Sequence, residues 1–423
     1  MATADYVTAT EQDHQEIYQF LAADAKDPPQ VVARHHYGST DPHYVPAQRH
    51  LVKVDGQIVS HVYAPRRLTR IGIAEVNIGG IMWVATDPEH RLRGYARQLM
   101  RNVFDYLDQT GCVASPLTTP IRDFYRPLGY EDYHNEYRTT INTDDLPADN
   151  PTNITIEQYT PDHLPDVMSI YDQCFADWSW TICRSQPYWQ WLIKNLEPED
   201  RILVAKDADR IVGYALYVSR DKALLSRDNA VWEAAHRPDC GNVYPALLAG
   251  LRRHLTAQNV AQLYLTLPTH HLLAQITRDL GGTTHVSPYY PSSTTSRMMK
   301  IINLRAYLDA ITPELQRRLQ HSPFADHQGA LSIQHTGEAL SPPASATIQL
   351  DHGRVAVQPA SDTPDTIAGN ERWITTLLIG QQTLTDACDL DRLTVSSDTA
   401  RQLGSALFPY TCPWRADLDN DTG

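Results

Sequence analysis

The sequence predicts an α/β (α+β) protein made of three successive units, at residues 1–147, 153–300 and 301–423. Three observations predict this class. In the first unit, a short apolar run of strand-forming residues leads through a turn into an amphipathic helix. The same order of elements recurs in the second unit. In the third unit, strand-like runs lie between helical segments, as in a sheet covered by helices.

The first unit opens with a helix and a hairpin. The helix is expected near Thr10–Ala22, where apolar residues recur at helical spacing. Strands at His50–Val54 and Gln57–Tyr63 meet at Asp55-Gly56, a dipeptide typical of tight hairpin turns. Residues 144–151, rich in Asp and Pro, read as the linker to the second unit.

The clearest local signal follows the hairpin. Ile81–Ala85 is short and apolar, and Asp87-Pro88 ends it. The next helix has apolar side chains at the spacing of one buried face, and Gly111 supplies its stop. These side chains are Ala96, Leu99, Met100, Val103 and Leu107.

The turn between this strand and this helix has the residues that a diphosphate site needs. Arg91, Gly94 and Ala96 form an Arg-x-x-Gly-x-Ala pattern. A diphosphate must approach main-chain amides closely, so a side chain at Gly94 would obstruct it. The first amides of a helix lack an intrahelical partner, and the helix dipole favours an anion there. Arg91 and Arg93 add positive charge. Taken alone, the pattern fits an ordinary basic strand–turn–helix equally well.

This segment resembles motif A of the GNAT superfamily of N-acetyltransferases, in which Arg/Gln-x-x-Gly-x-Gly/Ala holds the pyrophosphate of acetyl-coenzyme A (acetyl-CoA). The resemblance implies acetyl-CoA as cosubstrate. It also implies that Val84, Ala85 and Thr86 bind the pantetheine arm through their backbone. The implied diphosphate site comprises Arg91, Leu92, Arg93, Gly94, Tyr95 and Ala96.

Residues 117–131 resemble motif B of the same superfamily through the pattern Phe124-Tyr125-x-x-x-Gly129-Tyr130-Glu131. Tyr125 is the candidate general acid. Transfer from a thioester expels a thiolate whose conjugate acid has a pKa of about 8.5, with a Cys thiol as reference. A phenol with a pKa of about 10 keeps its proton at neutral pH and can protonate that sulfur. The alternative is a tyrosine that only packs beneath the turn.

The second unit repeats this order of elements but lacks the Arg-x-x-Gly-x-Ala pattern. Asp239-Cys240-Gly241-Asn242 stands in the turn, and an aspartate there would repel a pyrophosphate. We therefore interpret the unit as an acetyltransferase-like fold that has lost coenzyme binding, with a second active site as the alternative. Its expected elements are a helix at Pro161–Phe175, strands at Arg201–Lys206, Ile211–Ser219 and Val231–Pro238, and a helix at Val243–Thr256.

Tryptophan, histidine and cysteine residues outside these motifs are further candidates for functional roles. Four tryptophans either line a substrate pocket or pack in a core or domain interface: Trp178, Trp180, Trp189 and Trp191. The pairs His35-His36 and His270-His271 lack partners at zinc-like spacing, so we interpret them as loop or surface residues and expect no metal. The six cysteines of the chain form no C-x-x-C pair, which indicates reduced thiols.

The third unit resembles the sterol-carrier-like domain that ends one branch of the acetyltransferases. The resemblance lies in Leu377-Leu378-Ile379-Gly380 and in the run from Leu403 to Pro409. The expected elements are a helix at Leu304–Leu319, strands at Ala330–Gln334, Ala346–Leu350 and Arg354–Gln358, then Trp373–Ile379, and a final helix at Asp398–Leu407.

The whole chain resembles the enhanced-intracellular-survival (Eis-type) N-acetyltransferases. That family acetylates amines, notably aminoglycosides, and some members acetylate protein lysines. The resemblance implies a homo-oligomer, typically a hexamer. It also implies that the C-terminal carboxylate, here of Gly423, is the general base. Here the chain continues past the Pro-rich segment where the family ends, so Asp417, Asp419 or a group elsewhere are alternatives, as is a disordered acidic tail.

The amino-acid composition limits which binding partners and which cellular location we expect for the protein. The 50 acidic side chains exceed the 36 basic ones, giving a net charge of −14. This balance argues against nucleic acid and suits a cationic substrate. No apolar run reaches the roughly eighteen residues of a transmembrane helix, and the N-terminus lacks the features of a secretory signal. We therefore expect a cytoplasmic protein that does not bind membranes.

Together these observations predict direct transfer of acetyl from acetyl-CoA to a primary amine in a ternary complex. The amine would be an aminoglycoside or another polyamine-like cation. One alternative is the same chemistry on protein lysines or small metabolites. An alternative of a different class is a non-catalytic protein that binds coenzyme A or a lipid.

Overall fold

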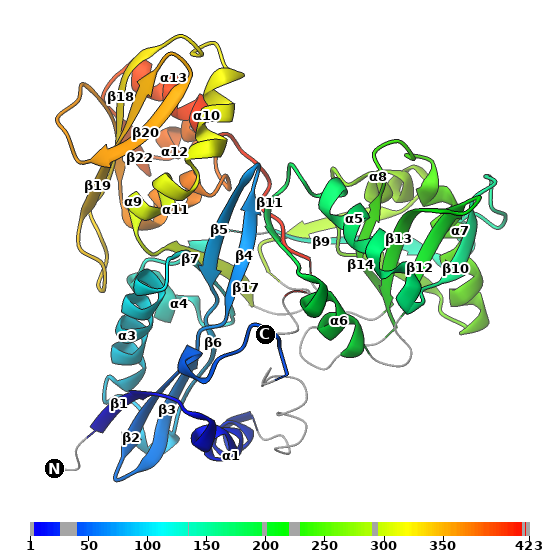
Figure 1. The fold of residues 1–423 in the computed structure, drawn as a ribbon, viewed down its shortest axis with the longest axis horizontal. Helices are drawn as coiled ribbons and strands as arrows, with labels where there is room; N and C mark the ends of the chain where they lie inside the picture. Colours follow the sequence, from blue (N-terminus) through cyan, green and yellow to red (C-terminus); the bar gives the residue numbers. More distant parts are fainter. Residues whose placement is uncertain are drawn as a thin grey trace.

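The computed structural model describes residues 4–25, 40–133, 135–196, 201–219, 229–289, 295–416 and 419. Figure 1 shows three lobes that meet at the centre of the molecule, one for each unit of the sequence. The first lobe is blue to cyan, the second is green, and the third is yellow to red. The α/β fold class predicted from the sequence is confirmed, because every lobe combines a sheet with covering helices.

The first lobe contains the predicted strand–turn–helix almost residue for residue. The strand is β6 (Met82–Thr86) and the helix is α3 (Tyr95–Gln109). The helix ends directly before Thr110, and Gly111 follows. The buried face of α3 carries Leu99, Met100, Val103, Phe104 and Leu107. The other elements are β1 (Ala4–Thr8), α1 (His14–Ala25), β2 (Arg49–Val54), β3 (Gln57–Tyr63), β4 (Arg66–Ile71), β5 (Ala74–Gly79), β7 (Cys112–Thr119), α4 (Arg122–Tyr125), β8 (Glu131–Asp132) and β9 (Glu136–Asn142).

Two neighbouring strands of the first lobe part from each other. These strands are β6 and β7. β7 pairs in parallel with β5, whereas β6 pairs with β3 and forms the edge of a separate four-stranded sheet of order β1-β2-β3-β6. The last link between the two sheets is the isolated bridge from Ile81 to Leu117. Beyond this bridge, β6 and β7 diverge.

The second lobe repeats the plan of the first. Its elements are β10 (Thr155–Gln158), α5 (Leu164–Cys174), β11 (Ser179–Ile182), α6 (Gln186–Lys194), β12 (Arg201–Asp207), β13 (Arg210–Val218), β14 (Ala230–His236), α7 (Val243–Ala257), β15 (Gln262–Leu265), α8 (Leu272–Asp279), β16 (Thr283–Ser287) and β17 (Ser296–Ile301). The helices and strands predicted here from the sequence are all present, with ends shifted by one or a few residues.

Strands are exchanged between these two lobes, which the sequence did not predict. β9 of the first unit lies between β15 and β16 in the seven-stranded sheet of order β10-β12-β13-β14-β15-β9-β16. In return, β11 and β17 of the second unit complete the six-stranded sheet of order β11-β4-β5-β7-β17-β8. The division of the chain near residue 150 stays a prediction, and strands cross it in both directions.

The third lobe is a five-stranded sheet of order β20-β19-β18-β21-β22 with helices against it. The predicted helix Leu304–Leu319 is in fact two helices, because the chain breaks at Ile311, just before Pro313 of the next helix. The elements are α9 (Leu304–Ala310), α10 (Thr312–Gln320), β18 (Gln328–His335), β19 (Ala344–Asp351), β20 (Arg354–Pro359), β21 (Asp365–Gly369), α11 (Glu371–Leu378), α12 (Leu384–Asp389), β22 (Leu393–Val395) and α13 (Asp398–Leu407).

Two of the four candidate tryptophans of the second unit pack in the interior. Trp180 and Trp189 are fully buried. The indole N–H of Trp180 donates to the carbonyl of Ile379 in the third unit at 3.0 Å, and its ring lies parallel to Tyr307. For Trp180 and Trp189, the structure therefore supports packing in a core or domain interface rather than lining of a substrate pocket.

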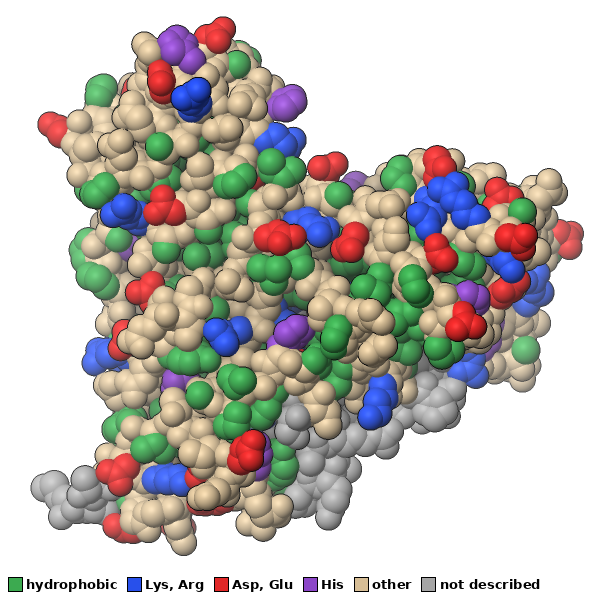
Figure 2. Space-filling view, in the orientation of Figure 1, with side chains coloured by type: hydrophobic (Ala, Val, Ile, Leu, Met, Phe, Trp, Pro, Cys, Tyr) green, Lys and Arg blue, Asp and Glu red, His purple; other side chains and the backbone are tan. Residues whose placement is uncertain are grey.

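On the face drawn in Figure 2, acidic and basic side chains of the described residues are interspersed among scattered apolar ones. Among the described residues, no helix combines the length and the apolar character needed to cross a bilayer.

The strand exchange yields a prediction about fragments. A fragment of residues 1–147 lacks β11 and β17, so β4 and β7 each lose a neighbour, and β9 loses its own sheet. Unpaired strand edges promote aggregation. We expect this fragment to show no cooperative urea unfolding by circular dichroism, whereas the full chain does. A monomeric fragment with a sharp transition would show that the exchange is not needed for folding.

Candidate functional site

The edge of β6 that faces away from β3 is the first part of the candidate site. On the inner side, Thr86 pairs with Ser60 and Ala85 pairs with His61. On the outer side, no described strand pairs with β6 beyond Ile81. Such an edge presents backbone N–H and C=O groups to an extended ligand. The structure thus places Val84, Ala85 and Thr86 along an open backbone edge.

A buried histidine holds β6 where its backbone bulges. Trp83 has φ of 52°, at the point where the register between β3 and β6 shifts. The Nδ1–H of His61 donates to the carbonyl of Trp83 at 2.8 Å, since a carbonyl can only accept. Its Nε2 therefore accepts from Arg49, at 3.1 Å. Burial and the charge of Arg49 hold the pKa of His61 well below its usual range, so the ring is neutral.

The turn after β6 exposes its backbone. Leu92 and Gly94 have φ of 63° and 82°, in the left-handed region, and the Leu92 side chain is fully exposed. A Cβ added at Gly94 would meet no protein atom within 4 Å. The demand for glycine there comes from the positive φ and from the open space in front of the amides. Backbone turned in this way forms an anion-binding concavity.

Helix α3 begins at this turn without a side-chain cap. Gly94 is its N-cap residue, and the first intrahelical bond runs from the amide of Gln98 to the carbonyl of Gly94 at 3.0 Å. The amides of Tyr95, Ala96 and Arg97 precede that bond, so they point outward at the positive end of a helix of 15 residues. This geometry is a ready site for a phosphate group.

Two exposed arginines flank the turn. The Nε of Arg91 donates to the carbonyl of Thr86 at 3.0 Å, and the guanidinium of Arg93 donates to the carbonyl of Glu89 at 3.0 Å. Both side chains therefore stay close to the turn, and both residues are exposed. They give the site the positive charge that a diphosphate requires.

Tyr125 lies in the apolar cluster beneath the divergence of β6 and β7. The cluster also contains Ile81 and Leu117, the two residues of the bridge. The Tyr125 ring packs edge-on against Phe124 and Tyr130, and its hydroxyl makes no hydrogen bond to a described residue. Burial raises the pKa of Tyr125 above its usual value. A phenol in this state holds its proton, as a general acid must.

In the second unit the corresponding strand edge is closed. β14 pairs with β15 at only two positions, so these strands also diverge. The Nε2–H of His271 donates to the carbonyl of Ala234 on β14 at 3.0 Å, while its Nδ1 accepts from the amide of Leu273. His271 lies in the loop before α8, as predicted, but it is buried rather than on the surface, and burial lowers its pKa to about 4. His35 and His36 lie outside the described residues.

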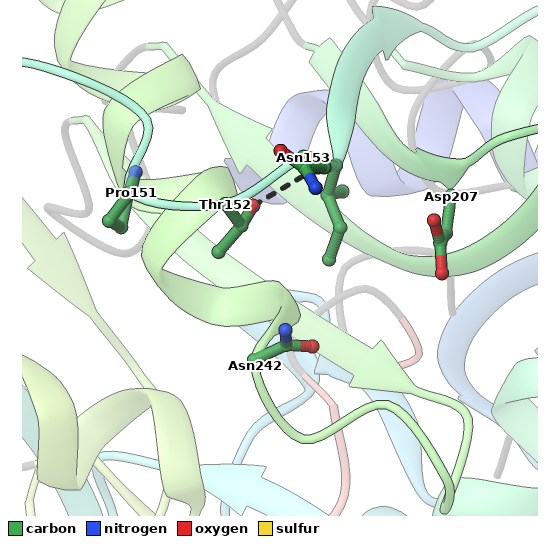
Figure 3. A pocket seen from close by; sticks show the side chains of 6 residues that line it. Pro151, Thr152, Asn153, Asp207 and Asn242 are labelled. Carbon is green, nitrogen blue, oxygen red and sulfur yellow. Dashed lines mark hydrogen bonds between the residues drawn. The ribbon is translucent and has the colours of Figure 1, made fainter.

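The turn of the second unit is also unsuited to a diphosphate. Asp239 pairs with Arg210 at 2.9 Å. Next to the start of α7 lies an open depression of about 330 Å³, drawn in Figure 3. Asp207, Asn242 and the linker residues 151–154 line it. A carboxylate beside the helix start opposes an anion, and the loss of coenzyme binding in this unit stays a prediction.

The C-terminal tail returns to the second unit. The Trp414 ring stacks on Phe175, and its amide donates to the carbonyl of Ser179 at 3.1 Å. Both carboxylate oxygens of Asp419 accept from Arg184, at 3.0 and 2.8 Å, and Arg184 also binds Glu233. All three of these ionic side chains are buried.

This ion pair bears on the general base. Both oxygens of Asp419 are engaged by one buried guanidinium, so this carboxylate serves an ion pair rather than an incoming amine. Asp417 and Gly423 lie outside the described residues.

Residues 5–132 match a family described as the acetyltransferase (GNAT) domain. This chain is an acyltransferase. The match spans β1 through β8, so it includes the open edge, the turn and Tyr125. No curated protein matches the sequence.

Solved structures share the fold along the whole chain. A probable N-acyltransferase from Enterococcus faecalis V583 has a TM-score of 0.80 at 18% identity, over 99% of this chain and 100% of that one. A GCN5-related N-acetyltransferase from Anabaena variabilis ATCC 29413 has a TM-score of 0.74 at 14% identity, over 98% and 99%. Eis1 from Mycobacterium abscessus has a TM-score of 0.67 at 17% identity, over 98% and 99%.

The open turn predicts a specific response to charge. Replacing Gly94 by Glu adds strain at positive φ and places a carboxylate before the helix amides. We expect acetyl-CoA affinity, measured by calorimetry, to fall by at least about tenfold, since two such penalties together exceed about 1.4 kcal/mol. The matched control is Gly241→Glu in the corresponding turn of the second unit, where a Cβ also meets nothing. Undiminished affinity in Gly94→Glu would refute the diphosphate site.

Proposed function

We propose that this acyltransferase moves the acetyl group of acetyl-CoA directly to a primary amine in a ternary complex. One observation carries the proposal: an open strand edge runs into an uncapped helix start, beside a buried tyrosine that keeps its proton. The edge suits the pantetheine arm, and the helix start suits the diphosphate. Val84–Thr86 and Arg91–Ala96 are the proposed contacts.

The proposed chemistry needs one acid and one base. The amine nitrogen forms a bond to the thioester carbonyl carbon, and the carbon–sulfur bond breaks. Tyr125 gives its phenolic proton to the departing sulfur, so the leaving group departs as a neutral thiol. The proton that the nitrogen sheds on becoming an amide restores the Tyr125 phenol. The amine must first lose a proton, and we assign this role to a carboxylate of the tail, either at Asp417 or at the chain end, Gly423.

The proposed acceptor is an aminoglycoside or a similar polyamine-like cation. The net charge of −14 supports this class, because a negative protein attracts a polycation over a distance. The wider proposal includes an Eis-type identity, a sterol-carrier-like third unit and a homo-oligomer, on the strength of the sequence resemblance. A protein lysine or a small metabolite is the competing acceptor, and a thiol-release assay over these amines separates the cases.

The role of Tyr125 has a direct test. Replacing it by Phe removes the proton donor and leaves the ring that packs against Tyr130. We expect kcat to fall about 10²- to 10⁴-fold, the range of general acid catalysis, with little change in the Kd for acetyl-CoA. Tyr130→Phe is the matched control, since the Tyr130 hydroxyl bonds the Ser115 hydroxyl at 2.7 Å and lies in the core. Unchanged turnover in Tyr125→Phe would overturn the acid assignment.

The tail is tested by two truncations. Removing 417–423 deletes Asp417, Asp419 and the native chain end, while Glu233 still pairs with Arg184. We expect this truncation to abolish turnover and keep the fold, because the base is lost but the core is intact. Removing only 420–423 keeps Asp417 and Asp419 but deletes Gly423, so activity in this variant excludes the Gly423 carboxylate and leaves the aspartates of the tail. Full activity of the longer truncation excludes the tail from catalysis.

A further inference from the structure

The turn that follows Tyr125 is fastened to the third unit. Residues Arg126–Leu128 form a single 3-10 turn directly after α4. The carbonyl of Pro127 in this turn accepts a hydrogen bond at 3.0 Å from the amide of Ala339, in the segment between β18 and β19. Thus a backbone hydrogen bond joins the candidate catalytic turn to the third unit.

A buried carboxylate bridges the same turn to helix α11. One oxygen of Glu131 accepts from Arg126, the neighbour of Tyr125, at 3.3 Å, and from the amide of Asp132 at 3.1 Å. The other oxygen accepts from Arg372 on α11 at 2.8 Å. Arg372 in turn reaches Glu338 at 3.2 Å, next to the segment that bonds Pro127. Glu131 is only 4% exposed, so water cannot readily replace these partners.

A second buried pair closes the turn at Gly129. This residue has φ of 94°, and a Cβ there would lie 2.5 Å from the Lys300 ammonium and 2.8 Å from the Glu371 carboxyl carbon. Lys300 and Glu371 form an ion pair, and Lys300 also donates to the Ser341 hydroxyl at 2.7 Å. The end of the turn is therefore pressed against residues of β17 and α11, with no room for a side chain.

Within the described residues, the Tyr125 hydroxyl itself has no such anchor. Tyr125 is held by ring contacts with Phe124 and Tyr130 and by the apolar cluster. Apolar contacts are not directional, so they do not by themselves fix the depth or angle of a phenol. Directional contacts instead fix the backbone around the ring. The Tyr125 carbonyl accepts from the amide of Tyr130 at 3.3 Å, and Arg126 binds Asp132 as well as Glu131. The contacts that reach the third unit are those of Pro127 and Glu131.

We propose that Arg372, acting through Glu131, positions the Tyr125 turn for acetyl transfer. Through this contact, the third unit helps to set the position of Tyr125. This inference rests on the proposed role of Tyr125 as general acid. A misplacement of about 1 Å in a reacting group costs up to about 10²-fold in rate, whereas a partly exposed ion pair adds little to stability. Arg372 is 24% exposed, so its loss should affect rate more than folding.

The test compares Arg372→Ala with Arg372→Lys and with a matched control. The control is Arg392→Ala. Arg372 and Arg392 both lie over the Trp373 ring, at 5.5 and 4.0 Å, but Arg392 bonds Gln382 of the third unit. We expect Arg372→Ala to lower kcat about tenfold with the KM for acetyl-CoA nearly unchanged. Arg372→Lys should recover part of the loss, and Arg392→Ala should match the wild type.

A double-mutant cycle shows whether Arg372 acts through Tyr125. In the Tyr125→Phe background, Arg372→Ala should have less than about a twofold further effect, because the proton that it helps to place is gone. Glu131→Gln provides a second variant that keeps the side-chain volume, and it should lower kcat in the same way. Thermal unfolding of every variant checks the fold.

Each outcome has a separate meaning. Unchanged kcat in Arg372→Ala, an equal loss in Arg392→Ala, or additive losses in the cycle would overturn the positioning role. Normal turnover in Tyr125→Phe would instead overturn the proposed acid, whatever Arg372 does. If Arg372→Ala does not fold, an unchanged kcat in both Arg372→Lys and Glu131→Gln overturns the inference.

Discussion

Much of the candidate site follows from the divergence of two strands. Beyond the bridge between Ile81 and Leu117, β6 stays with β3 while β7 stays with β5. A strand that has lost its neighbour must leave backbone groups unpaired or offer them to a ligand. The same divergence brings the start of α3 to the end of that edge and leaves Tyr125 beneath it. His61 and Arg49 secure the bulge that makes β6 turn away.

In the second unit, groups of the chain itself contact the strand at the corresponding divergence. There His271 bonds the carbonyl of Ala234, and Asp239 pairs with Arg210 across the turn. The chain's own tail is bound next to this strand, through Asp419, Arg184 and Glu233. The same order of strands and helices thus leaves a strand edge open in the first unit, whereas in the second unit side chains and the C-terminal tail contact the corresponding strand.

The sequence predicts local structure well where pattern and turn chemistry agree. The hairpin at Asp55-Gly56, the strand before the turn and the helix after it all lie where composition and spacing put them. The final helix has the same ends as predicted, Asp398–Leu407. In each case the signal is contained in a few neighbouring residues, so no long-range contact had to be known.

Long-range contacts could not be predicted in this way. The exchange of β9 for β17 depends on which sheet edge each strand finds, and an alternating strand pattern fits either sheet. His271 resembles a surface residue in sequence because its partner, Ala234, lies far away along the chain. Glu131 was visible as the end of a motif, but its bond to Arg372 joins residues of different units. Sequence spacing carries no signal for such pairs.

The most direct test of the central claim is hydrogen exchange at the backbone amides, followed by mass spectrometry, with and without acetyl-CoA. If the edge of β6 and the start of α3 hold the ligand, amides of Val84–Thr86 and Gly94–Arg97 should exchange more slowly when it is added. Amides at the start of α7 should be unaffected. Protection at α7, or none along β6 and α3, would contradict the account.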